Sequence, residues 1–248
     1  MRPLFIKFLI IICTIILNFN SSLAKEFKYD VRAYNLNVMD INFNIDDEVN
    51  NKITFSAESV GIVGFFVKVF AKSKVEFNDK SKNTWKYEYR YDKPSSNKYR
   101  VNKINFSKEK VLNFVTDPPR NEDLTKKVPY NKEDYFGVID PIFAVKKLFL
   151  LDKKIKVFDG NIFFYLAMKK EKEQIDFDSV FSNYKGTLQK CILTYQPISG
   201  HIPGDPNTPE QFKVDLYFGI VGDNYFPIYA TTKGKKGIRL KMYLDTIQ

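Results

Sequence analysis

DPIFAVKKLFLL, residues 140 to 151, is the segment that decides the fold, because it reads as one helix in a chain of strands. Asp140 is a good N-cap residue, and Pro141 suits the first helical position, where a backbone N–H would have no helical partner. Apolar side chains then recur at helical spacing and form one stripe, which consists of Ile142, Val145 and Phe149. An amphipathic helix of this kind needs an apolar surface to pack on, so the segments around it must supply a sheet.

Those surrounding segments alternate apolar and polar residues with the period of two that half-buried strands have. The clearest example runs from Trp85 to Tyr91, with four aromatic residues on one face and three charged residues on the other. We expect roughly ten to twelve strands, and a sheet of that size curls or closes rather than leave exposed edges. The predicted fold class is therefore mainly β: a large curved antiparallel sheet or incomplete β-barrel with one central amphipathic helix.

Residues 1–24 have the order of regions found in a secretory signal peptide. Two basic residues come first, residues 8–19 are almost continuously apolar, and Ser22 and Ala24 are the small residues that signal peptidase requires. The apolar run is shorter than the roughly 20 residues that cross a bilayer, so we expect cleavage after Ala24, with an uncleaved N-terminal anchor as the alternative. Residues 25–248 would then form a single β-rich domain in the periplasm.

The chain is strongly basic, with 39 Lys and Arg residues against 29 Asp and Glu residues and a formal net charge of +10. Such a charge would favour anionic partners such as phospholipid headgroups, lipopolysaccharide or nucleic acid. The lysines are scattered along the strands rather than gathered in a patch, which favours a solvated surface. We therefore expect no nucleic-acid partner, while peripheral contact with a membrane stays open.

The sequence contains no recognisable constellation of catalytic residues. It has no nucleophile elbow, no Walker loop and no dinucleotide-binding glycine motif. His201 is the only histidine, and Cys191 is the only cysteine after the signal segment, so a zinc site would lack nitrogen and sulfur ligands. We expect a non-enzymatic protein with no metal and no cofactor. A hydrolase with an unrecognised site is the weakest alternative.

Two segments are candidates for contact with a ligand. Residues 61–66 connect two expected strands and carry four large apolar side chains, which are Ile62, Val63, Phe65 and Phe66. Exposed connections are seldom so apolar, so these residues would either contact a ligand or partner at the rim of the sheet, or be buried against the helix or across a barrel mouth. On the aromatic strand, Trp85 and Tyr87 would either bind a ligand or pack in the core.

Several short sequence segments resemble segments found in one family of Gram-negative envelope proteins. They are the Asp140-Pro141 helix start, Val157-Phe158-Asp159-Gly160, Cys191 to Tyr195 leading into Pro197-Ile198-Ser199-Gly200, and Pro227-Ile228 before the last hairpin. With these segments the chain resembles the domain of unknown function family 3108 over about residues 27–245. The resemblance implies an incomplete barrel with a helix on its concave side, similar to the periplasmic lipoprotein carriers. It implies no established activity.

These observations favour a periplasmic protein that binds or chaperones an apolar envelope molecule, either a lipid or an acylated protein, on the concave face of its sheet. The physical reason is that an incomplete barrel has an apolar inner face too large for one helix to fill. The alternative is a structural or assembly factor whose exposed loops dock onto another envelope protein. A large internal cavity would favour the first function, and a filled core with an exposed apolar patch would favour the second.

Overall fold

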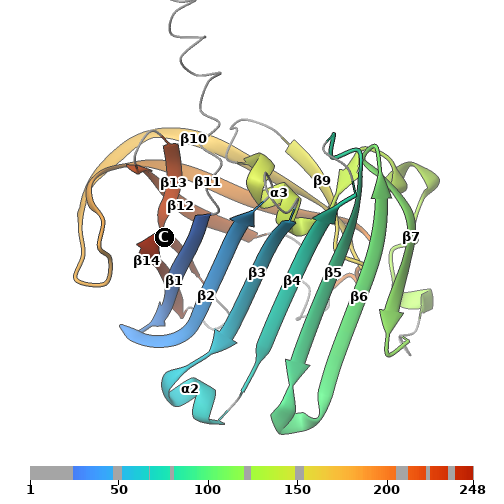
Figure 1. Ribbon diagram of the computed structural model, residues 1–248, viewed down its shortest axis with the longest axis horizontal. Helices are drawn as coiled ribbons and strands as arrows, with labels where there is room; N and C mark the ends of the chain where they lie inside the picture. Colours follow the sequence, from blue (N-terminus) through green and yellow to red (C-terminus); the bar gives the residue numbers. More distant parts are fainter. Residues whose placement is uncertain are drawn as a thin grey trace, which may run out of the picture.

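In the computed structural model the chain forms one curved sheet with a few short helices (Figure 1). The structure describes residues 25–46, 52–66, 68–78, 81–119, 124–148, 154–204, 212–221, 224–233 and 238–247. The expected signal segment, residues 1–24, lies outside these ranges. None of the helices within them has the length and apolar character needed to cross a membrane.

Fourteen strands of the described residues form a single sheet. They are β1 (Lys25–Ala33), β2 (Leu36–Asp46), β3 (Lys52–Ser59), β4 (Phe70–Phe77), β5 (Thr84–Lys93), β6 (Lys98–Ser107), β7 (Lys110–Asp117), β8 (Val138–Ile139), β9 (Lys154–Phe158), β10 (Phe163–Asp178), β11 (Lys185–Ser199), β12 (Phe212–Val221), β13 (Asn224–Lys233) and β14 (Arg239–Ile247). The helices are α2 (Gly61–Phe66) and α3 (Pro141–Leu148), with 3-10 turns η1 (Pro94–Ser96), η2 (Leu124–Lys126) and η3 (Lys132–Tyr135). Neighbouring strands are antiparallel except for β8 and β9, which are parallel.

The sheet curves until its two edges approach each other. Its strand order is β7-β6-β5-β4-β3-β2-β1-β14-β13-β12-β11-β10-β9-β8, so β7 and β8 are the edges. At one corner Lys110 and Phe136 form an isolated bridge, and the Val138 N–H donates to the Glu109 carbonyl at 2.8 Å. The fold is therefore a nearly closed, barrel-like sheet, which confirms the predicted mainly β class and its curvature.

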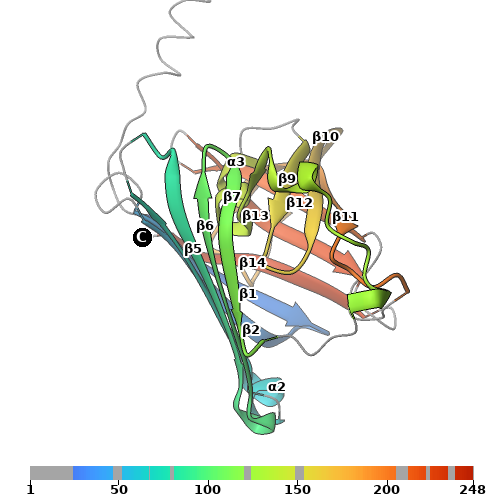
Figure 2. The same cartoon turned by 90° about the vertical axis from the view of Figure 1, so that its right-hand side faces the viewer.

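The two halves of the sheet face each other across a shared interior. Figure 2 shows the early strands on one side and β9 to β13 on the other. Phe27, Phe43 and Phe55 lie opposite one another across β1, β2 and β3, and Ile53 and Val75 are fully buried. Because side chains alternate between the two faces of a strand, these inward positions gather into one apolar core.

Helix α3 packs inside one end of this sheet and begins at the residue predicted from the sequence. Asp140 caps it, since its Oδ1 accepts the backbone N–H groups of Ile142 and Phe143 at 2.9 Å each. The other carboxylate oxygen, Oδ2, accepts the indole N–H of Trp85 at 2.8 Å. Ile142 and Ala144 are buried, so the helix turns an apolar side toward the sheet.

The far end of the predicted helix is not described. The structure gives α3 eight residues, Pro141–Leu148, whereas the sequence pattern extended to Leu151. Phe149 and Leu151 lie outside the described residues, and the side chain of Val145 is not described either. Only Ile142 of the predicted stripe can therefore be placed, and it is buried as expected.

The prediction of a single helix is wrong, because residues 61–66 form a second, six-residue helix, α2. Its backbone is held by Gly64, whose N–H donates to the Val60 carbonyl at 2.9 Å, and Val60 in turn donates to the Val38 carbonyl at 3.1 Å. A side chain on Gly64 would place its Cβ 2.6 Å from the Ser59 carbonyl oxygen, so only glycine allows this tight approach.

Candidate functional site

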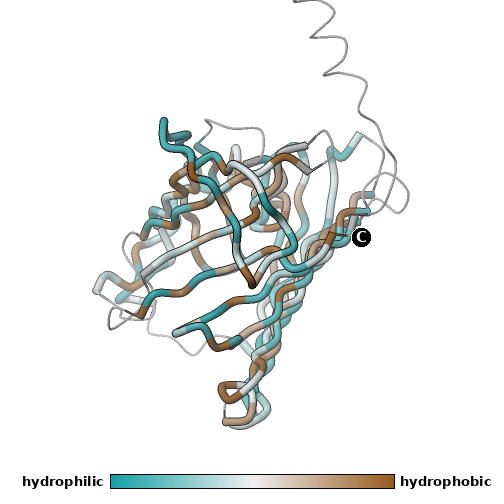
Figure 3. Tube along the Cα trace, turned by 90° about the vertical axis from the view of Figure 1, so that its left-hand side faces the viewer, coloured by the Kyte–Doolittle hydropathy of each residue, from teal (hydrophilic) through white to brown (hydrophobic). Residues whose placement is uncertain are grey.

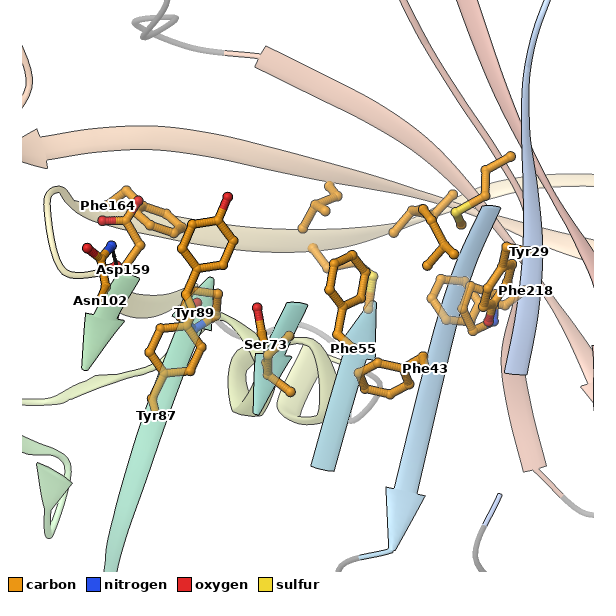
Figure 4. A pocket seen from close by; sticks show the side chains of 18 residues that line it. Tyr29, Phe43, Phe55, Ser73, Tyr87, Tyr89, Asn102, Asp159, Phe164 and Phe218 are labelled. Carbon is orange, nitrogen blue, oxygen red and sulfur yellow. Dashed lines mark hydrogen bonds between the residues drawn. The ribbon is translucent and has the colours of Figure 1, made fainter. Parts of the chain in front are cut away.

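The concave side of the sheet contains an apolar cavity of about 570 Å³ (Figure 4). Its walls come from both halves of the sheet and from the first turn of α3. The lining residues are Tyr29, Ile41, Phe43, Phe55, Ser73, Tyr87, Tyr89, Asn102, Pro141, Ile142, Asp159, Phe164, Met168, Leu193, Leu216, Phe218, Pro227 and Met242. A volume of this size, with mostly apolar walls and a few polar groups, is typical of a site for a small molecule.

Within the described residues, helix α3 is short compared with the strands that line the cavity. Eight helical residues span about 12 Å, whereas strands of eight to ten residues, such as β4 and β5, span about 26–34 Å. The ring of Phe143 covers one end of these strands, where it contacts Phe77 and Trp85. Further along, inward side chains such as Tyr89 line open space instead of the helix.

Three tyrosines on the wall have a pKa that burial raises. Burial raises the pKa of Tyr29 and that of Tyr87 well above the pKa of a free phenol, and it raises the pKa of Tyr89 to about 12. The Tyr87 hydroxyl also shares a hydrogen bond with Ser73. At neutral pH these hydroxyl groups can donate hydrogen bonds but carry no charge, so the wall suits an uncharged part of a ligand.

One end of the cavity is formed by the turn between β9 and β10. Asp159 Oδ1 accepts the backbone N–H groups of Asn161 and Ile162 at 2.7 and 2.8 Å. Asn102 Nδ2 donates to the Asp159 carbonyl at 2.8 Å and so joins this turn to β6. Gly160 adopts a φ of 94°, and a Cβ there would lie 2.9 Å from the Asn102 side chain. The Asp159-Gly160 pair therefore lets the turn reach the opposite half of the sheet.

Asp140 lies next to the wall residue Pro141 but serves the helix rather than the cavity. Its side chain is fully buried, and burial raises the pKa of the carboxyl to about 6, while hydrogen bonds from Phe143, Trp85 and Ile142 oppose that rise. Because both oxygens already accept hydrogen bonds, the carboxyl is placed as a helix cap. Among the residues that the structure describes, no group of three or more His, Cys, Asp or Glu side chains is placed to hold a metal ion.

The structure separates the two predicted site residues of the aromatic strand. Tyr87 lines the cavity. Trp85 lies in the core with 1% of its surface exposed, stacked on Phe106 with ring centroids 5.0 Å apart. The interpretation of Trp85 as a ligand-contacting residue is therefore replaced by its alternative, core packing, because its ring faces α3 and its N–H is bound by Asp140.

The predicted site residues of the 61–66 segment lie on α2, away from the cavity wall. They are Ile62, Val63, Phe65 and Phe66, all of them exposed, and the lining of the cavity includes none of them. The alternative interpretation of this segment, burial against the helix or across a barrel mouth, does not hold, because all four side chains are exposed. The apolar surface of α2 is therefore a separate feature of the molecule.

Most of the cavity wall could not be identified from the sequence. Phe55, Leu193, Leu216 and Met242 are ordinary inward residues of alternating strands, and long-range strand pairing brings them together. The period of two marks such residues as inward-facing. It does not distinguish those that lie under α3 from those that face open space.

Comparison with known proteins assigns no family to the chain. No protein-family model matches it, and no curated protein matches it. Among solved structures, the chain is similar to the crystal structure of a beta-barrel-like protein of the domain of unknown function family DUF1849 from Brucella abortus. The TM-score is 0.49 and the sequence identity is 8%, over 92% of this chain and 98% of that chain. Membership in the domain of unknown function family 3108 stays a prediction.

Proposed function

We propose that this protein binds an apolar molecule, the acyl chain of a lipid or of an acylated protein, in the cavity of its barrel-like sheet and acts without catalysis. The observation that carries the proposal is a cavity of about 570 Å³ lined largely by aromatic and aliphatic side chains. Export to the periplasm is part of the same proposal, and it rests on the basic, apolar and small-residue order of residues 1–24.

The chemistry of the wall favours a chain-like, uncharged ligand segment. Phe43, Phe55 and Met168 offer apolar surface, and each methylene group buried against such a surface contributes about 0.8 kcal/mol to binding. The carboxylate of Asp159 already accepts hydrogen bonds within its turn, and the phenols are neutral. Because an ionised group is costly to bury without a partner, a charged headgroup should stay at the mouth of the cavity.

A variant in which a larger side chain fills the cavity tests the proposal. Leu193 lines the cavity, whereas Ile192, its neighbour on β11, points to the other face of the strand. Leu193→Trp should lower the affinity for a fluorescent fatty acid, 11-(dansylamino)undecanoic acid, at least about tenfold, because the indole would occupy the space of the chain. The matched variant Ile192→Trp should bind within about twofold of the unchanged protein.

Two results would contradict the proposal, provided that thermal melting shows both variants to be folded. One is that the unchanged protein does not bind the fluorescent fatty acid. The other is that Leu193→Trp and Ile192→Trp bind it equally well. Native mass spectrometry of protein purified from its own envelope would add the identity of a co-purifying lipid.

A further inference from the structure

The molecule displays several exposed apolar side chains at one end of its sheet. They are Ile62, Val63, Phe65 and Phe66 on α2 and Tyr34 and Leu36 at the turn between β1 and β2, and we call these six residues the apolar tip. Phe65 and Phe66 expose 85% and 72% of their surface. Figure 3 shows hydrophobic residues gathered at this end of the trace. Large apolar side chains are rarely left in water in such a group without a binding partner.

The fold holds the backbone of this tip in place while its side chains point outward. Two hydrogen bonds between Ser59 and Val69 close the base of the connection. The Ser59 N–H donates to the Val69 carbonyl at 3.0 Å, and the Val69 N–H donates to Ser59 Oγ at 2.9 Å. Gly61 comes so close to β2 that a Cβ there would lie 2.8 Å from the Asn37 carbonyl oxygen. No residue of α2 is buried. The exposure of the rings is therefore built into the local structure.

Basic side chains flank the apolar tip. Phe70 pairs with Asp92, which places the β5–β6 turn beside the connection that carries α2 (Figure 1). Lys93 and Lys98 pair across that turn, and among the described residues neither of them forms an ion pair. Two nearby carboxylates each lie beside a base, since Asp92 contacts Arg90 at 2.7 Å and Glu58 contacts Lys68 at 4.0 Å, while Asp40 accepts a hydrogen bond from the Asn37 amide at 2.7 Å. The end of the sheet is therefore apolar at its tip and positive at its flank.

We propose that the apolar tip docks this protein onto an anionic lipid bilayer, with the side chains of α2 inserted among the headgroups and acyl chains. Apolar residues that insert a few ångströms and basic residues that meet anionic headgroups are the two elements of interfacial membrane binding. A stable protein interface uses about 20–30 residues on each side, many more than the six of this tip. A bilayer needs no such area, because a protruding element can enter it.

Docking at this point would also bring the cavity close to the membrane. Ile41 lines the cavity and pairs with Ala57, and the next inward pair, Met39 and Ser59, stands at the end of β3, just before α2. Two residues of strand span about 7 Å. This link to the cavity rests on the proposed function, whereas docking itself would stand even if the cavity bound nothing.

Sedimentation with lipid vesicles tests the docking. The protein should bind vesicles of phosphatidylethanolamine and phosphatidylglycerol, and Phe65→Ser/Phe66→Ser should weaken that binding at least about 100-fold, because two inserted rings are lost. The matched control is Leu112→Ser/Val115→Ser, which removes two apolar side chains of β7 that are 58% and 64% exposed. The control should change binding less than about threefold.

A second pair of variants tests the basic flank. Lys93→Glu/Lys98→Glu should weaken binding to the phosphatidylglycerol vesicles at least about tenfold, since each basic residue near an anionic surface contributes about fivefold. On vesicles of phosphatidylcholine alone the same change should have little effect. Equal losses on both kinds of vesicle would overturn the electrostatic part of the proposal.

Three outcomes would overturn docking to a bilayer altogether. The protein does not sediment with either kind of vesicle, or Phe65→Ser/Phe66→Ser binds phosphatidylglycerol vesicles as well as the unchanged protein does. The third is a dimer in solution that Phe65→Ser/Phe66→Ser dissociates, which would assign the tip to a self-interface. Titration of each variant with 11-(dansylamino)undecanoic acid, without vesicles, keeps a failure of docking apart from a failure of the cavity.

Discussion

Helices α3 and α2 lie at opposite ends of β4, and the two ends arrange apolar side chains in opposite ways (Figure 1). At the α3 end, the ring of Phe143 packs edge-on against Phe77 and Trp85, with centroid distances of 5.2 and 5.4 Å. At the α2 end, Phe65 and Phe66 contact each other with centroids 5.3 Å apart and otherwise face solvent. One end buries its aromatic rings, and the other displays them.

The two ends also differ in what holds their backbone. A buried side-chain pair, Trp85 and Asp140, fixes the start of α3. At α2, glycines and main-chain hydrogen bonds hold the backbone, and the large side chains are exposed. We therefore expect changes at the α3 end to alter the free energy of unfolding, and changes at the α2 end to alter surface binding alone.

The largest expected loss of stability follows truncation of Trp85. Trp85→Ala removes a side chain with 1% of its surface exposed, which should lower the free energy of unfolding by about 3–5 kcal/mol. Trp85→Phe keeps most of the ring but removes the N–H that Asp140 accepts, which should cost about 1–3 kcal/mol. Urea denaturation followed by circular dichroism measures both. A loss below about 1 kcal/mol for Trp85→Ala would remove the contrast between the two ends.

Asp140 should make the stability of the α3 end depend on pH. The folded protein raises the pKa of this carboxyl from 3.8 to about 6, so the folded state binds a proton more tightly than the unfolded state does. The resulting stabilisation is fully present below about pH 4 and is lost as the pH rises through about 6. It amounts to about 3 kcal/mol, since one pKa unit corresponds to about 1.4 kcal/mol.

Asp140→Asn isolates this effect, because asparagine keeps the shape but does not titrate. The free energy of unfolding of the unchanged protein, minus that of the variant, should fall by about 3 kcal/mol between about pH 3 and pH 7. Denaturation curves at several pH values would show it. A difference that stays constant, or that grows with pH, would mean that burial of the carboxyl does not control its ionisation.

Only the α3 side of the contrast between the two ends could be predicted from the sequence. The start of α3 could be predicted from Asp140 and Pro141, because helix capping and the preference of proline for the first helical position are local effects. Residues 61–66 contain two glycines and two β-branched residues, which disfavour a helix, and α2 forms only because its ends are anchored on β2 and β3. The partnership of Trp85 with Asp140 joins residues 55 positions apart, which no local pattern reveals.

The presence of a cavity could be predicted from the size of the sheet, but the residues that line it could not. A curved sheet with one short helix leaves part of its inner face uncovered, and this much follows from strand and helix lengths. Which inward residues remain uncovered depends on the register between distant strands, such as the pairing of Leu244 with Tyr29. The period of two predicts that a side chain points inward, but it does not predict which side chain of another strand lies opposite it.

Gly160 offers a smaller effect near the α3 end. Gly160→Ala would force an alanine to a φ of 94° and press its Cβ against Asn102, which should lower the free energy of unfolding by about 2 kcal/mol or more. Gly204 is the matched control, because its φ is 73° but no atom lies within 4 Å of a Cβ there. Gly204→Ala should cost about 1 kcal/mol. Equal losses in thermal denaturation would show that the contact with Asn102 is unimportant.

The smallest expected change in stability belongs to the apolar tip, although its change in binding should be large. Phe65→Ser/Phe66→Ser replaces rings that are already mostly in water, so the free energy of unfolding should stay within about 0.5 kcal/mol of the unchanged protein. Urea denaturation of this variant beside Trp85→Ala measures both ends of β4 in one experiment. A loss of 2 kcal/mol or more in the tip variant would mean that Phe65 and Phe66 pack against the protein in solution. The two ends of the sheet would then be alike, and the tip would have no apolar surface left to offer a bilayer.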